Sequence, residues 1–237
     1  MSENKTGKYF KYAIGEIILV VIGILIALQI SEWKKESETA ELELKMLKEI
    51  HSNLNNDLIQ IRGDISLMQE MDTACINLRQ TIKSKTIPSE NFAKNAGLLR
   101  VMPHYHPNKS GYGLLTSKGI EFVSNDSLRN AISTHYEQLY TYYKRYEDER
   151  FDFHINLSEP KLLEYFSFDF DLDHQFYWEA SISSKDYEEI VEDESFEKLL
   201  SAIEMENKQV LSRAFRVEKS IDALINLLIE EIYEMEN

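Results

Sequence analysis

Two histidines in the middle of the sequence have the residue type and spacing of metal ligands. His104 and His106 are separated by one residue, so an extended segment would point both imidazoles to the same side. His135, His154 or an acidic side chain would then have to complete the site. The prolines on either side of the pair favour an ordered loop instead.

Three aspartates later in the chain resemble the start of a calcium-binding loop. Asp169, Asp171 and Asp173 alternate with other residues, as the first oxygen ligands of such a loop do. The loop also needs a glycine at its sixth position and a bidentate glutamate at its twelfth. His174 and Ala180 stand there instead. We therefore expect a solvated acidic edge at these residues.

The rest of the sequence holds no arrangement typical of catalysis. The stretch Gly111–Gly113 is not followed by the lysine and hydroxyl residue of a phosphate-binding loop, and no nucleophile elbow or H-E-x-x-H motif is present. Cys75 has no second cysteine for a disulfide or a thiolate site. The tyrosines between Tyr136 and Tyr146 could line a ligand groove, although such residues more often pack a bundle. We expect a protein that is not an enzyme and uses no cofactor.

The charge of the chain disfavours one class of partner and suits another. The 237 residues carry a formal net charge of −15, and residues 36–237 hold 38 acidic against 21 basic side chains. Such a domain repels phosphate backbones, so we expect no nucleic-acid binding. Residues 1–35 hold five lysines against three glutamates, which suits the anionic headgroups of a lipid bilayer.

Residues 12–33 have the length and composition of a transmembrane helix. As a helix they cover about 33 Å, close to the thickness of the hydrocarbon core. Aromatic residues stand at both ends and lysines flank them, as is usual at membrane interfaces. A cleaved signal peptide and a buried helix of a soluble protein are the alternatives. Ala27–Gln29 is not a small-x-small cleavage site and Glu16 interrupts the apolar region, so we expect an uncleaved signal anchor.

The orientation of this anchor follows from its flanking lysines. The lysine-rich tail of residues 1–11 favours a cytoplasmic N-terminus, and residues 34–237 would then form an acidic helical domain on the other side. Lys34, Lys35, Lys45 and Lys48 follow the span and act against this orientation. We expect the N-terminus inside and the C-terminal domain outside.

One face of the predicted transmembrane helix could contact a second helix. Helical spacing places Glu16, Val20, Gly23, Ala27 and Ser31 on this face. Gly23 and Ala27 form a small-xxx-small pair that allows close approach. Glu16 could pair with a partner in this seam, handle protons in an energised complex, or simply reach the headgroups from near the interface.

A long helix is predicted to follow the span. Apolar residues recur there at alternating spacings of four and three, which predicts a helix of about 45 residues. No breaker separates it from the span, so we expect one continuous helix. Three positions of the pattern are polar, which favours packing against other helices over a coiled-coil dimer. The positions are Ala40, Leu44, Leu47, His51, Leu54, Leu58, Ile61, Ile65, Met68, Asp72, Cys75, Arg79 and Ile82.

The remaining chain predicts two more long helices around an irregular middle region. Residues 84–125 hold three of the four prolines, with short helical or extended pieces expected at 98–102 and 113–123. An N-cap signal at Ser124–Asp126 starts a helix through Phe153. Its apolar positions are Leu128, Ile132, His135, Leu139, Tyr142, Tyr146 and Phe153.

The last part of the chain continues this helical pattern after a short extended piece. A short helix is expected from Ser158 to about Phe166, and alternation over 166–173 predicts an extended segment. Residues 183–236 are predicted to be helical, with a break near Asp193. Its inward positions are Leu200, Ile203, Asn207, Val210, Ala214, Val217, Ile221, Leu224 and Leu228. The predicted fold is all-α: an N-terminal transmembrane helix, then an elongated antiparallel helical bundle with an irregular middle region.

Two stretches are similar to a known family. The run Y-A-I-G-E-I at Tyr12–Ile17, the apolar residues after it and A-L-Q-I at Ala27–Ile30 with Trp33 resemble the opening of the domain of unknown function 6090 family. Tyr112–Glu121 with Ser127–Arg129 resembles a later segment of that family, although Gly113 intrudes. The family consists of small single-pass membrane proteins of Bacteroidota. The resemblance implies a bacterial inner-membrane location and no activity. With the orientation expected from the lysines, the C-terminal domain would lie in the periplasm.

These features together predict a membrane-anchored, non-enzymatic interaction or sensory module. Its expected partners are the lipid bilayer and either a second copy of the chain or another membrane protein. The alternative is an accessory subunit of an energy-coupling or transport assembly that uses Glu16 in the membrane.

Overall fold

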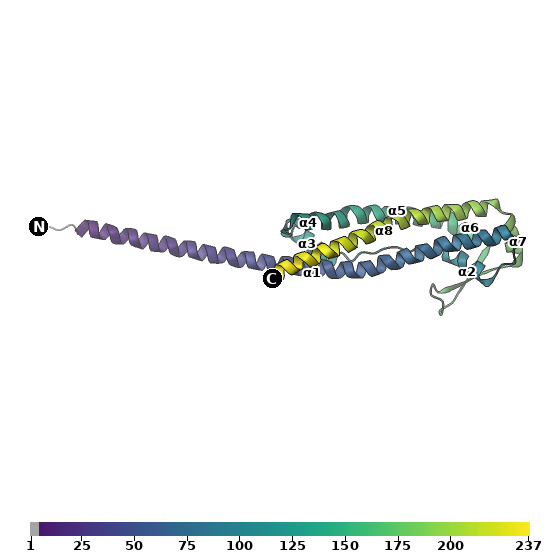
Figure 1. Cartoon of the computed structure of the whole chain (residues 1–237), viewed down its shortest axis with the longest axis horizontal. Coiled ribbons are helices and arrows are strands. Elements are labelled where there is room, and N and C mark those ends of the chain that lie inside the picture. Colours follow the sequence, from purple (N-terminus) through teal and green to yellow (C-terminus); the bar gives the residue numbers. More distant parts are fainter. Residues whose placement is uncertain (1–4) are drawn as a thin grey trace.

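The computed structural model describes the backbone of residues 5–237 and the side chains of residues 14–237 (Figure 1). The side chains of the predicted tail, residues 1–11, all lie outside the described part. Helices dominate the described chain, and the two strands it contains are short. The prediction of an all-α fold is therefore confirmed.

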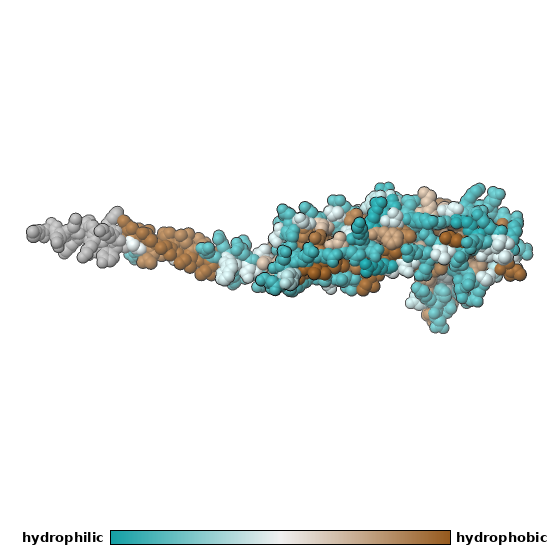
Figure 2. Space-filling view, viewed as in Figure 1, coloured by the Kyte–Doolittle hydropathy of each residue, from teal (hydrophilic) through white to brown (hydrophobic). Residues whose placement is uncertain are grey.

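Helix α1 runs from Lys5 to Ser84 without a break and confirms the predicted continuous helix. Its 80 residues extend about 120 Å. The N-terminal part projects alone, whereas the C-terminal part packs in the bundle (Figure 1). A space-filling view shows that much of the projecting part is strongly apolar (Figure 2).

Two further helical columns complete the bundle with the second half of α1: one packs directly on α1, and the other packs mainly on that column. The first is one uninterrupted column made of α4 (Asp126–Ser133), the π-helical turn η2 (Thr134–Leu139), α5 (Tyr140–Phe153), the π-helical turn η3 (His154–Ser158) and α6 (Glu159–Leu163). The second column is α8 (Glu194–Glu236), which follows α7 (Ser184–Glu192). The bundle is elongated and α8 is antiparallel to α1, as the sequence predicts.

The two ends of the bundle hold different parts of the chain. The C-terminus lies where α1 enters the bundle (Figure 1), and Lys48 and Glu236 form an ion pair there at 2.5 Å. The other end, far from the projecting helix, carries α7. The predicted break near Asp193 is confirmed there, because Asp193 caps α8 by accepting a hydrogen bond from the Ser195 N–H at 2.8 Å.

The middle region is more helical than predicted. It contains α2 (Glu90–Leu98), α3 (Ser110–Lys118) and the 3₁₀ turn η1 (Ile120–Phe122). The helical piece expected at 113–123 is present, whereas 98–102 forms no element of its own and only includes the end of α2.

Polar side chains of α1 hold this middle region against the bundle. Glu43 accepts a hydrogen bond from the Ser124 N–H at 2.7 Å. Asn53 accepts one from Gly111 at 3.0 Å, and Asp57 accepts one from Asn108 at 3.0 Å. These backbone groups belong to no long helix or sheet. The side chains of α1 therefore accept hydrogen bonds from N–H groups that burial would otherwise leave without a partner.

A β-hairpin accompanies the helices at the end far from the projecting helix. Strand β1 (Phe166–Phe170) confirms the predicted extended segment, and β2 (Trp178–Ile182) pairs with it antiparallel. The sequence analysis assigned no partner strand to β1. The short helix expected to reach Phe166 ends at Leu163 and continues α5 instead of standing apart.

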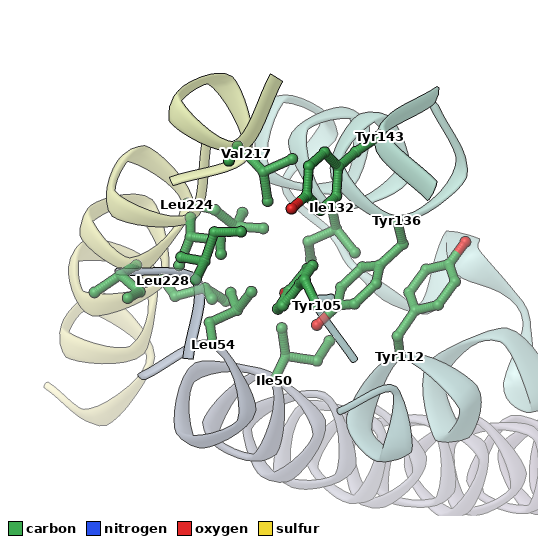
Figure 3. Close-up of a cluster of buried hydrophobic side chains, with 14 of the residues drawn as sticks. Ile50, Leu54, Tyr105, Tyr112, Ile132, Tyr136, Tyr143, Val217, Leu224 and Leu228 are labelled. Atoms are coloured by element: carbon green, nitrogen blue, oxygen red, sulfur yellow. The ribbon is translucent and has the colours of Figure 1, made fainter. Parts of the chain in front are cut away.

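The core of the bundle consists of two apolar clusters arranged along its length. The cluster nearer the projecting helix is the larger one, and Figure 3 shows part of it between α1, α8 and the α4–α5 column. The second cluster lies between α1, α2, the hairpin, α7 and the start of α8. All nine inward positions predicted for α8 are buried.

The inward face of the α4–α5 column differs from the prediction. It follows the expected positions as far as His135, but Tyr143 is fully buried while Tyr142 is 43% exposed. The π turn η2 lies between these positions and is wider than an α turn. It advances the buried face by one residue, so that Tyr143, Glu147 and Arg150 point inward.

Candidate functional site

A group of charged and amide side chains separates the two apolar clusters. This polar layer consists of Asp64 and Asp72 from α1, Glu147 and Arg150 from α5, and Asn207 from α8. The apolar clusters meet it at Met68 and Met71 on α1 and at Ile203 and Val210 on α8. All three columns of the bundle therefore contribute to the layer.

The Asn207 amide connects α8 to α1 and, through a longer hydrogen bond, to α5. Its Nδ2 donates to the backbone oxygen of Met68 and to the Asp72 carboxylate, both at 2.7 Å. Its Oδ1 accepts a longer hydrogen bond from Arg150, at 3.5 Å. The amide is fully buried, so these partners replace the water that it would otherwise bind.

Arg150 and Glu147 hold the extended segment before α3 against the bundle. Arg150 is only 3% exposed and donates to the Pro103 carbonyl, while Glu147 accepts a hydrogen bond from the Tyr105 N–H at 2.8 Å. Arg150 Nε and Glu147 Oε2 are both buried and have no hydrogen-bond partner within the described chain. Such groups are usually satisfied by internal water.

A cavity of about 240 Å³ lies beside these two side chains. Both oppositely charged residues line it, together with the segment that they hold. Its wall consists of Met102, Pro103, His104, Lys144, Glu147, Asp148, Arg150 and Phe151. The cavity is large enough to hold water beside Arg150 and Glu147.

Burial changes the acidity of the carboxyl groups in the layer. Burial raises the pKa of Asp64 to about 6, although the nearby charges of His104 and Arg150 oppose this rise. Burial likewise raises the pKa of Asp72 and Glu147. Asp64 and Glu147 both lie near the one guanidinium of Arg150, so the layer gains excess negative charge as pH rises. These carboxyl groups therefore suit a contact between helices whose strength depends on pH.

The tyrosines considered as a groove mostly fill the core. Tyr136 and Tyr143 are buried, and Tyr112 stacks on Tyr136 with 4.4 Å between ring centroids (Figure 3). Tyr142 and Tyr146 instead lie at the surface side of the column, where the Arg213 guanidinium stands 3.4 Å from the Tyr146 ring centroid. The structure therefore favours the packing interpretation.

The histidines do not assemble as the metal hypothesis required. The His104 and His106 rings are exposed and 4.5 Å apart, whereas His135 is buried beside Ser220. His154 is buried beside Ser158, with Nδ1 and the serine hydroxyl 2.9 Å apart. In residues 14–237, no group of three or more His, Cys, Asp or Glu side chains is placed to hold an ion.

The three aspartates belong to the hairpin and its loop. Asp169 lies on β1 directly opposite Glu179 of β2. Asp171 accepts a hydrogen bond from the Asp173 N–H at 2.9 Å, which shapes the loop. These positions agree with the predicted acidic edge.

The structure leaves the predicted membrane-seam residues free to meet a partner. Glu16, Gly23 and Ala27 lie on the projecting part of α1 and are exposed. A side chain added at Gly23 would meet no atom within 4 Å. One helix among the described residues is long and apolar enough to cross a membrane, and its apolar window is not buried by the rest of the chain.

Sequence reasoning missed the polar layer as a unit. Asp72 and Asn207 did interrupt the apolar seams of their helices, and such interruptions were the available signal. Glu147 and Arg150 were not among the predicted inward positions, because the sequence gives no sign of the π turn before them.

The fold and the layer define a class of protein. In this class, a long apolar helix continues into an antiparallel all-α bundle whose core contains a polar layer. The model of a family described as "Family of unknown function (DUF6090)" matches residues 16–208, and the chain belongs to this family. The matched residues include the apolar helix, the polar layer and the hairpin. No curated protein and no solved structure matches the chain.

Proposed function

We propose that the chain is a single-pass protein of a bacterial inner membrane with its N-terminus in the cytoplasm and its bundle in the periplasm. The apolar residues of α1 from Ile14 to Ile30 are all exposed, as lipid-facing residues of a transmembrane helix would be. Trp33 is exposed at the end of this stretch, where an interfacial aromatic belongs. The lysine-rich N-terminal tail supports the orientation.

We propose further that the bundle is a non-enzymatic interaction or sensory module. The observation that carries this proposal is the unbroken α1, which joins the apolar span to Asp64 and Asp72 in the polar layer. A helix transmits rotation or displacement along its axis, so a partner bound at the bundle can act on the span. The buried charges support this role, because Arg150 and Glu147 join chain segments to each other.

The Glu16 face supplies the expected contact inside the membrane. Gly23 and Ala27 offer a smooth surface on which a second copy or another transmembrane helix can pack closely. The accessory-subunit alternative gives the Glu16 carboxyl an additional role as an ionising group. Glu16 is exposed in the isolated chain, which suits either role.

Association of the full chain in lipid nanodiscs or mild detergent tests the module and separates it from the alternative. Gly23→Leu should shift the complex to monomer, because the added side chain separates the helices, whereas Val21→Leu on the opposite face should not. Clean monomer at all concentrations for the unmodified chain would contradict self-association. If the bundle is an interaction module, Glu16→Gln should leave association and the cellular phenotype unchanged. If the accessory-subunit alternative is correct and ionisation of the Glu16 carboxyl is needed, the substitution should abolish the phenotype.

A further inference from the structure

The hairpin formed by β1 and β2 has two chemically different faces. Its polar face carries Asp169 opposite Glu179 and Ser167 opposite Ser181. Its apolar face carries the three cross-strand pairs Phe166–Ile182, Phe168–Ala180 and Phe170–Trp178. This alternation is the pattern of a sheet that covers a core with one side only.

Helix α2 and the segment after it cover part of the apolar face. The Trp178 ring packs on Gly97 so closely that a Cβ on this glycine would stand 2.2 Å from Cζ3 of the ring. The Arg100 guanidinium lies over the Phe168 ring, 4.1 Å from its centroid. These contacts fix the hairpin on the bundle.

On the β1 side, the outer end of the same face has no cover in the described chain. Exposure rises along β1 from 3% at Phe166 to 77% at Phe170. Leu172 and Tyr177 in the connecting loop are also exposed large apolar residues. We name Phe170, Leu172 and Tyr177 the hairpin tip. The hairpin projects sideways from the end of the bundle that is far from the projecting half of α1 (Figure 1).

Negative charge surrounds the hairpin tip. Residues 162–184 contain five acidic side chains and no lysine or arginine. Asp169 and Glu179 stand directly opposite each other, and like charges in such a pair repel. The nearby basic residues are already paired: Lys94 of α2 with Glu90, and Arg100 just after α2 with Glu159.

We propose that the hairpin tip is the docking site for a basic segment of another protein that also carries apolar side chains. Cationic groups would relieve the repulsion between Asp169 and Glu179, and apolar groups would cover Phe170 and Leu172. A second copy of this acidic chain would add like charge at the tip, and anionic lipid would be repelled in the same way. This inference rests on the proposed interaction module and names the chemistry of its partner.

Fluorescence of Trp178 tests this docking in the full chain. Trp33→Phe leaves Trp178 as the single tryptophan, and the protein is reconstituted in nanodiscs of uncharged lipid. The probe is a short peptide in which lysine alternates with valine. Its addition should change Trp178 emission saturably, and added salt should weaken the binding. A matched peptide with glutamate in place of lysine should not bind.

Variants of the hairpin then locate the binding. Phe170→Ser with Leu172→Ser, and separately Asp169→Asn with Glu179→Gln, should each weaken the affinity about tenfold. The control Glu188→Gln with Glu230→Gln removes two exposed charges elsewhere and should leave it unchanged. No binding of the lysine peptide, equal binding of the glutamate peptide, or equal affinity of hairpin and control variants would overturn the docking site. These outcomes leave association through Gly23, which tests the proposed function, unaffected.

Discussion

Arg150 is the residue on which the polar layer depends most. Arg150→Met removes the guanidinium and leaves Glu147 buried without its positive neighbour. Removing the buried charge that compensates Glu147 should lower the free energy of unfolding by about 3–5 kcal/mol. Urea unfolding followed by circular dichroism measures the loss. Adding Glu147→Gln to Arg150→Met should restore part of the stability, and a loss no larger than that of an exposed control such as Arg145→Met would contradict the account.

Asp64 should make the stability of the bundle depend on pH. Its pKa is about 6 in the folded protein against 3.8 for the unperturbed group, so the folded state binds the proton more tightly. The stabilisation from this proton is complete below about pH 4 and is lost as pH rises through 6. Asp64→Asn cannot ionise, and its advantage over the unmodified protein should grow by about 1–2 kcal/mol between pH 4 and pH 7.5 after allowance for partial exposure.

Thermal unfolding of the two proteins across this pH range measures that difference. Burial lowers the pKa of His135 to about 4, which destabilises the fold as pH falls below 6.5. This contribution is common to both proteins and cancels in the comparison. A difference that stays constant with pH, or that grows towards acid, would show that Asp64 does not titrate as described.

Gly111 shows how closely one short helix approaches α1. A Cβ at this position would lie 2.8 Å from the backbone nitrogen of Ile50, whereas a Cβ at Gly113 in the same helix α3 would meet nothing within 4 Å. Gly111→Ala should therefore cost about 1–3 kcal/mol, since α3 must move away from α1. Gly113→Ala should be neutral or stabilising by up to about 1 kcal/mol. Equal effects in urea unfolding would contradict the close packing of α3.

The elements differ in how far the sequence predicted them, and periodicity explains the difference. The seam of α8 follows one unbroken period, and each position predicted from it is buried. The period of α4–α5 changes at η2, so the prediction was wrong at Tyr142, which is exposed, and missed Tyr143, which is buried. Pro160 is typical of the start of a separate helix. In the structure, the wide π turn η3 lies directly before it, and the helical column continues through the proline. Strand β2 was not predicted, although its five residues alternate between apolar and polar side chains, because so short a run is a weak signal by itself.

At the scale of the whole molecule, α1 unites features that the sequence showed separately. Its apolar span and its heptad-like seam were both readable, and the lack of a breaker between them predicted one helix. The polar layer was not readable as a site, because it needs three columns in the correct rotation. The molecule therefore has an apolar span at one end, a buried polar layer within the bundle and the hairpin far from the span.

Membrane extraction and cysteine labelling of the full chain test the central claim most directly. Cys75→Ala provides a background, since the native thiol is buried, and single cysteines are placed by Ser2→Cys or Asn237→Cys. The protein should remain with membranes in alkaline carbonate at its full-length mass. In spheroplasts, a membrane-impermeant maleimide should label Asn237→Cys at once and Ser2→Cys only after lysis. Release by carbonate, loss of the N-terminal segment, or the reverse labelling pattern would contradict a bundle anchored through α1 on the outer side of the membrane.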